Sequence, residues 1–186
     1  MSYKSAYDIA DAFGYLTHNE VRGLKELAKM LPENPTIGII GVGSGTSSVA
    51  VMEERKDAKL YSVDIRKESP FGGLENELNA FKERGLNISD RHEQILGDSK
   101  EIGKLFEHKL DMLFIDGDHS YEGCLGDFNN WIDHIKYGGV LAFDDYGDNK
   151  HGDERWPDVR KVVDEHVRER FNEIGHWDSL IAFAVI

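Results

Sequence analysis

Acidic side chains directly follow two apolar segments of this sequence, 110–115 and 140–143, where they could bind a cation. Asp116 comes after the first segment, and Asp144 and Asp145 come after the second. Carboxylates held within a few ångströms of one another repel strongly unless they are protonated or neutralised by a cation. Oxygen ligands without a nearby cysteine favour Mg²⁺, Ca²⁺ or Mn²⁺ over zinc, so we predict a divalent-cation site on these three residues. The alternative is that the acids cap helices and coat a solvated edge.

His119 is the side chain nearest to this pattern that could accept a proton. It lies three residues after Asp116, at the expected start of a helix. In that position its imidazole could act as a general base on a metal-bound hydroxyl. A lone histidine at a helix start can also be purely structural, and the residue types alone leave both readings open.

A glycine-rich loop, Gly41-Val-Gly43-Ser44-Gly45-Thr46, lies between a predicted strand and a predicted helix. Glycines allow a tight turn and a close approach of the backbone to a ligand, so this context indicates a nucleotide-type cofactor site. The dinucleotide fingerprint would place its third glycine at Thr46, so the spacing weakens a pyrophosphate interpretation. The alternative is an ordinary turn rich in glycine.

Two further acids follow the next two predicted strands. Asp64 ends the second strand, about 20 residues after the glycine loop. An acid there can accept hydrogen bonds from the hydroxyl groups of a ribose. Asp98 follows the third strand, next to Ser99, and could reach the edge of an adenine ring. Asp98 could equally cap the helix that begins near residue 100.

The elements that must position these residues alternate along the chain. Apolar runs predict strands, and residues spaced by three or four predict helices. The predicted strands are 36–40, 59–63, 93–96, 110–115 and 140–143, with a closing hairpin at 171–176 and 179–186; the predicted helices are 21–31, 46–55, 74–84, 99–107, 121–135 and 159–167. We expect an α/β fold with a doubly wound, mostly parallel sheet of about seven strands, an antiparallel C-terminal hairpin and N-terminal helices. Ligands bind beyond the carboxyl ends of such strands, where the glycines and acids lie.

The helix expected at 121–135 is the most regular, and Gly138-Gly139 would end it. Phe128 and Trp131 fall on its apolar stripe and are expected in the core. We expect one domain over 1–186, with a helical lid or cap at 1–34 and the sheet with its helices at 35–186.

Composition excludes several classes of protein. The formal net charge is −13, and residues 111–153 contribute −8 of it, so binding to a phosphate backbone is not expected. No apolar run is long enough for a membrane span. The single cysteine excludes an internal disulfide, and the start lacks the apolar core of a secretory signal, so we expect a cytoplasmic protein.

Taken together, these motifs resemble those of class I S-adenosylmethionine-dependent methyltransferases. The resemblance rests on the glycine loop, Asp64, Gly97-Asp98 and two blocks, Phe114-Ile-Asp-Gly-Asp-His-Ser-Tyr121 and Tyr137-Gly-Gly-Val-Leu-Ala-Phe-Asp-Asp-Tyr146. The two blocks look like the branch of metal-dependent sugar O-methyltransferases and cephalosporin-hydroxylase-like proteins, and the layout is similar to that of the catechol O-methyltransferases. One departure is Ile39, which stands where the first strand of such enzymes usually carries an acid.

The resemblance implies a Rossmann-like fold, a methyl acceptor with a hydroxyl group, and defined site residues. It places S-adenosylmethionine on Gly41, Gly43, Ser44, Gly45, Thr46, Asp64, Asp98, Ser99 and Asp116, and Mg²⁺ or another divalent cation on Asp116, Asp144 and Asp145. It makes His119 the catalytic base. The preferred acceptor is a vicinal diol of a sugar or small natural product, because a divalent cation can bind two adjacent oxygens.

Aromatic residues near the N-terminus, Tyr3, Tyr7, Phe13 and Tyr15, could fold over the site as a lid, with the loop 147–157 as the opposite wall. Both segments fit surface packing or a subunit contact, and hence a homo-oligomer, equally well. Three other functions stay open: an NAD-type oxidoreductase, a non-catalytic cofactor-binding protein of the same fold, and a metal-dependent hydrolase. The hydrolase would leave the glycine loop and Asp64 without a task.

Overall fold

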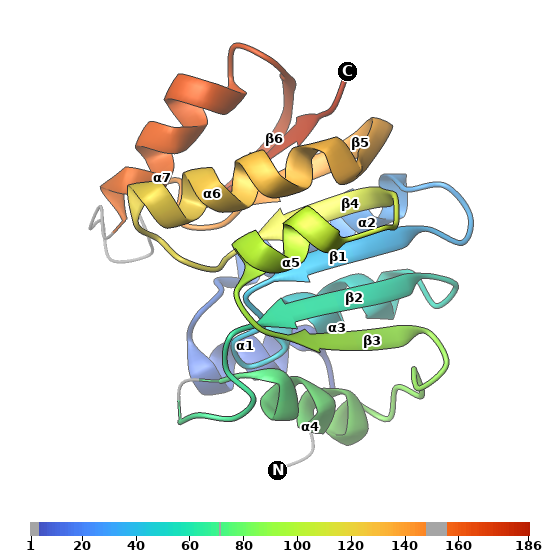
Figure 1. The fold of residues 1–186 in the computed structure, drawn as a ribbon. Coiled ribbons are helices and arrows are strands. Elements are labelled where there is room, and N and C mark those ends of the chain that lie inside the picture. Colours follow the sequence, from blue (N-terminus) through green and yellow to red (C-terminus); the bar gives the residue numbers. More distant parts are fainter. Residues whose placement is uncertain (1–3, 71, 148–155) are drawn as a thin grey trace.

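Seven strands pair into one mixed sheet that carries helices on both faces (Figure 1). The computed structural model describes residues 4–70, 72–147 and 156–186. In these ranges the strands are β1 (Thr36–Ile40), β2 (Lys59–Asp64), β3 (His92–Leu96), β4 (Leu110–Ile115), β5 (Ile135–Phe143), β6 (Asn172–Trp177) and β7 (Leu180–Ala184). The helices are α1 (Ala6–Phe13), α2 (His18–Met30), α3 (Thr46–Glu54), α4 (Leu74–Arg84), α5 (Ser99–Leu105), α6 (Tyr121–Trp131) and α7 (Pro157–Val162), which a π-helical turn, η2 (Val163–Val167), extends.

The strand order is β3-β2-β1-β4-β5-β7-β6, with β1 to β5 parallel and β7 antiparallel to both of its neighbours. The chain therefore crosses from β1 outward to β3 and then returns to β4 on the other side. This order confirms the predicted Rossmann-like, doubly wound sheet with its C-terminal antiparallel hairpin. It places a switch point between β1 and β4, where open α/β sheets bind their ligands.

Alternating side chains of the central strands pack into two separate cores, one on each face of the sheet. Met112 and Phe114 of β4 pack with α1 to α4 on one face, whereas Leu113 and Ile115 pack with α5 to α7 on the other. This alternation follows from the period of two in a strand. A strand covered on both faces is mostly apolar, and in β4 the exception is Asp111, whose carboxylate pairs with Lys136. Phe128 and Trp131 are buried in the second core, as predicted.

The predicted helix at 121–135 is wrong at its C-terminal end. α6 ends at Trp131, a short 3₁₀ turn η1 (Ile132–His134) follows, and β5 already begins at Ile135, which pairs with Leu110 of β4. Ile135 continues the helical spacing only by coincidence, because its burial comes from the sheet. Gly138 and Gly139 thus lie inside β5, where the pairing with β4 shifts its register, instead of ending a helix.

The N-terminal helices pack beside α3, on the face of the sheet opposite α6 (Figure 1). α2 begins with a capping box, in which Thr17 and Glu20 each bond the backbone of the other. The segment between α1 and α2, residues 14–17, lines the site described next. No helix among the described residues is long and apolar enough to cross a membrane.

Candidate active site

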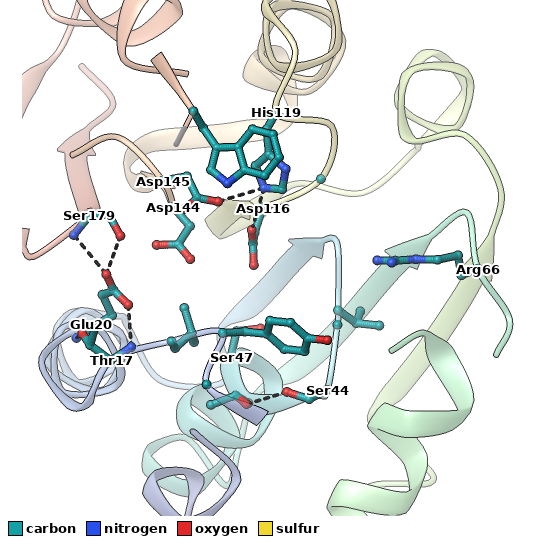
Figure 2. Close-up of a pocket in the computed structure, with 18 residues that line it drawn as sticks. Thr17, Glu20, Ser44, Ser47, Arg66, Asp116, His119, Asp144, Asp145 and Ser179 are labelled. Carbon is teal, nitrogen blue, oxygen red and sulfur yellow. Dashed lines mark hydrogen bonds and ion pairs between the residues drawn. The ribbon is translucent and has the colours of Figure 1, made fainter. Parts of the chain in front are cut away.

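A cavity of about 340 Å³ opens at the carboxyl ends of β1, β4 and β5. That volume lies within the range of small-molecule sites in proteins. Its lining comes from the segment 14–20, the glycine loop and the residues after β4 and β5, together with Arg66, Trp156 and Ser179 (Figure 2). The structure therefore brings the predicted glycine loop and the predicted carboxylates to one space.

The glycine loop turns sharply because all three of its glycines have a positive φ, which other residues rarely adopt. Gly41 has φ +80°, and a Cβ there would lie 1.9 Å from the carbonyl oxygen of Asp116. Gly45 has φ +86°, caps α3 and packs against α4. Neither lines the cavity, whereas Gly43, Ser44 and Thr46 do, and the hydroxyl oxygens of Ser44 and Thr46 are 2.8 Å apart. Gly41 and Gly45 shape the loop, and the residues between and after them face the ligand space.

Asp64 is buried at the end of β2 and bonds the loops on either side of it. Its carboxylate accepts hydrogen bonds from the backbone N–H of Val42 at 3.1 Å and of Arg66 at 2.7 Å. Arg66 also donates from Nε at 3.3 Å, and both Arg66 and Val42 line the cavity. Asp64 therefore holds the glycine loop in place, and its predicted contact with a ribose stays a prediction.

Asp98 and Ser99 lie outside the lining of this cavity. The Asp98 carboxylate accepts from the backbone N–H of Lys100 and caps α5, which is the alternative considered from the sequence. The Ser99 hydroxyl donates to Asp127 of α6 at 2.5 Å. The cofactor role assigned to both residues stays a prediction, and it requires a ligand that reaches past Asp64.

His119 joins two of the three predicted metal ligands. Its Nε2 lies 2.9 Å from an Asp145 carboxylate oxygen and 3.3 Å from an Asp116 carboxylate oxygen. Asp116, His119 and Asp145 each offer one ligand atom, and these three atoms lie within 4.8 Å of one another. Asp145 lies two residues after the end of β5 and has φ +58°. Aspartate tolerates this left-handed conformation better than most residues do.

Asp144, the remaining predicted ligand, is only 5% exposed and lines the same cavity. Its Oδ1 atom has no hydrogen-bond partner among the described residues. A buried carboxylate without partners is costly, and it is retained where a proton, a cation or a ligand completes it. Such an atom beside two further carboxylates is the donor chemistry that a hard divalent cation needs. The residues present therefore fit the predicted cation.

The electrostatics of the cluster follow from burial and from like charges. Burial raises the pKa of Asp116 to about 6 against the lowering effect of His119, and Asp145 raises it further. Burial, Asp116 and Glu20 hold the pKa of Asp144 well above its usual range. Burial lowers the pKa of His119, but its bonds to Asp116 and Asp145 prevail and raise it to about 10. Without a cation, the imidazolium thus neutralises part of the carboxylate charge.

The structure adds residues that the sequence did not indicate. Glu20 is 1% exposed; its Oε1 accepts from Ser179 N–H at 3.0 Å and from the Ser179 hydroxyl at 2.5 Å, and its Oε2 accepts from Thr17 N–H at 2.6 Å. The spacing of Thr17 and Glu20 signals a helix cap, but nothing in the sequence indicates that this glutamate also faces a cavity. Arg66 had no signal of its own.

The two predicted walls are described in part. Tyr15 lines the cavity, and Phe13 stacks on Tyr15 with 6.5 Å between ring centroids. Tyr7 instead contacts His18, the first residue of α2. Tyr3 and residues 148–155 of the opposite loop lie outside the described residues. Trp156, at the end of that loop, stacks on His119 with 4.5 Å between centroids. A lid role for the N-terminal segment stays a prediction.

Comparisons with known proteins give both a family and a fold. A family model described as a methyltransferase domain matches residues 39–146, which include the glycine loop and all three predicted metal ligands. A curated relative, the uncharacterized protein R132 of Acanthamoeba polyphaga mimivirus, is 28% identical over 168 residues, or 86% of this chain and 74% of the relative.

Solved structures resemble the chain over nearly its whole length. A protein from Corynebacterium glutamicum has a TM-score of 0.74 at 16% identity and covers 97% of this chain and 88% of its own. The O-methyltransferase TomG from Streptomyces achromogenes, in complex with SAM, has a TM-score of 0.69 at 18% identity and covers 97% and 88%. The SAH-bound methyltransferase PaMTH1 from Podospora anserina has a TM-score of 0.71 at 20% identity and covers 95% and 82%. At these identities the likeness establishes the fold.

Proposed function

The chain belongs to the family of methyltransferase domains, and on that premise we propose that it is an S-adenosylmethionine-dependent O-methyltransferase assisted by a divalent cation. The proposed acceptor is a hydroxyl of a vicinal diol on a sugar or small natural product. One observation carries the proposal: one cavity joins the glycine loop to the three carboxylates, and a buried oxygen of Asp144 has no hydrogen-bond partner among the described residues.

The glycine-loop end of the cavity is the proposed place of the cofactor. S-adenosylmethionine supplies an electrophilic methyl group when it is bound. Gly43 and Ser44 would meet its amino-acid end, because a backbone without a Cβ permits close approach, and Asp64 holds the loop in that conformation. The SAM and SAH complexes among the structures of this fold support a cofactor of this kind.

The carboxylate end is the proposed place of the cation and the acceptor. Asp116, Asp144 and Asp145 would hold the cation. A divalent cation bound there would lower the pKa of a coordinated hydroxyl and offset the carboxylate charge that keeps His119 protonated. Asp116 borders both ends, since it lies beside the glycine loop and within reach of His119, so it would align the acceptor with the cofactor.

His119 is the proposed base. Its Nε2 faces the cavity between Asp116 and Asp145, so a proton taken from the acceptor would be held by both carboxylates. Trp156 stacks on the imidazole and limits its rotation. General-base catalysis of this kind contributes about 10²–10⁴-fold to a rate.

The test separates cofactor, cation and acceptor. Calorimetric titration with S-adenosylmethionine, S-adenosylhomocysteine and NAD should give micromolar binding of the first two and none of NAD; the reverse would favour an oxidoreductase. Catechol, a simple vicinal diol, should be methylated with Mg²⁺ and not in EDTA. Full activity in EDTA would refute the role of the cation. If neither S-adenosylmethionine nor S-adenosylhomocysteine binds, the methyltransferase assignment is refuted.

A further inference from the structure

The carboxylate end of the cavity carries more negative charge than a divalent cation would offset. The acidic and basic residues that line the described cavity are four acids, Glu20, Asp116, Asp144 and Asp145, and two bases, Arg66 and His119 (Figure 2). Arg66 lies at the glycine-loop end and bonds Asp64, away from the other charges. A divalent cation together with a protonated His119 therefore leaves this end of the cavity net negative.

Glu20 is the acid that the proposed cation does not use. A glutamate at the third position of a capping box normally lies on the surface, but this one is 1% exposed and faces the cavity. Its three hydrogen bonds come from neutral donors, the Thr17 and Ser179 amides and the Ser179 hydroxyl. No cationic side chain among the described residues pairs with it, so a cationic group of a ligand in the cavity could do so.

The chain as a whole has a net charge of −13. A cleft lined with charge of one sign concentrates ligands of the opposite sign and repels those of the same sign.

We propose, resting on the function proposed above, that the methyl acceptor is a cationic diol, with a protonated amine close to the two hydroxyl groups, and that Glu20 selects for this charge. Asp144 and its neighbours hold the cation and the hydroxyl groups, while Glu20 attracts the ammonium group from the opposite side of the same space. Acceptors that carry phosphate or carboxylate groups are rejected by the same charge.

The experiment uses three catechols of similar size that differ in charge: dopamine is cationic, ethylcatechol is neutral and dihydroxyphenylacetate is anionic. With S-adenosylmethionine and Mg²⁺, kcat/KM for dopamine should exceed that for dihydroxyphenylacetate by about tenfold or more, with ethylcatechol between them. In Glu20→Gln the ratio should fall to about threefold or less. The matched control is Glu26→Gln, the same change on the exposed side of α2, which should keep the ratio of the wild type.

Wild-type protein alone gives a second measurement, which covers the case in which Glu20→Gln does not fold. The preference for dopamine should shrink as salt rises from 0.1 to 1 M, because the screening length falls from about 10 Å to about 3 Å. Equal kcat/KM values for the three catechols, or a preference that neither salt nor Glu20→Gln reduces, would overturn the charge inference and leave the proposed function standing. Methylation of none of them, despite binding of S-adenosylmethionine, would count against the proposed diol acceptor and this inference together.

Discussion

Asp127 should make the protein less stable as the pH rises, and its replacement by asparagine should remove that loss. The carboxyl group lies on α6, with no exposed surface, and its Oδ2 atom has no hydrogen-bond partner among the described residues. Ser99 donates to the other oxygen at 2.5 Å. Burial raises the pKa of Asp127 to about 6, while the bond from Ser99 acts in the opposite direction.

The magnitude follows from that shift. The pKa is about 6 in the folded chain, against an ordinary value of 3.8. Since a shift of one pKa unit is worth about 1.36 kcal/mol, this difference lowers the free energy of unfolding by about 3 kcal/mol once the group is ionised. Because the folded pKa is raised, the protonated acid is favoured in the folded state. The loss of stability is therefore absent below pH 3.8, develops between about 4 and 6, and is complete above pH 6.

The assay is urea denaturation of the wild type and Asp127→Asn at several pH values, followed by tryptophan fluorescence. The two proteins should be similar at about pH 4, where asparagine replaces a neutral acid, and the variant should be more stable by up to about 3 kcal/mol at about pH 8. The difference between the proteins isolates Asp127 from the other buried acids. Asp133→Asn, the same change at an exposed position near the end of α6, is the control. A stability difference that stays flat with pH would refute the reasoning.

Three further changes test the site. Gly41→Ala should unfold the glycine loop or abolish cofactor binding, because its Cβ would lie 1.9 Å from the Asp116 carbonyl oxygen. The control Gly85→Ala has a similar φ and no atom within 4 Å of its Cβ, so it should lower the free energy of unfolding by only about 1–2 kcal/mol. His119→Ala should reduce kcat by about 10²–10⁴-fold with an unchanged Kd for S-adenosylmethionine; a wild-type rate would exclude it as the base. Mg²⁺ at 100 times its Kd should stabilise the wild type by about 2.7 kcal/mol in calorimetric melting and should not stabilise Asp144→Ala; equal Tm shifts would contradict Asp144 as a ligand.

The residues that could be assigned from the sequence are those whose signal is local. A strand covered on both faces is mostly apolar, and five of the six residues of β4 are, so β4 was predicted at its observed bounds, Leu110–Ile115. The end of α6 was not, because Ile132 and Ile135 keep a helical spacing while the chain turns into β5. Only pairing with β4, a contact between segments far apart in the chain, decides between the two.

The sequence by itself determined which groups meet at the site: glycines where the backbone must turn, and carboxylates after two strands of a parallel sheet, whose carboxyl ends necessarily meet at one edge. Tertiary structure alone decided how the acids are used. Asp64 bonds two backbone amides, and Glu20 bonds Ser179, 159 residues away, so that its charge enters the cavity. The physical reason is that a carboxylate can satisfy its lone pairs on a cap, a loop or a ligand alike, and only the fold determines which of these partners lies within reach.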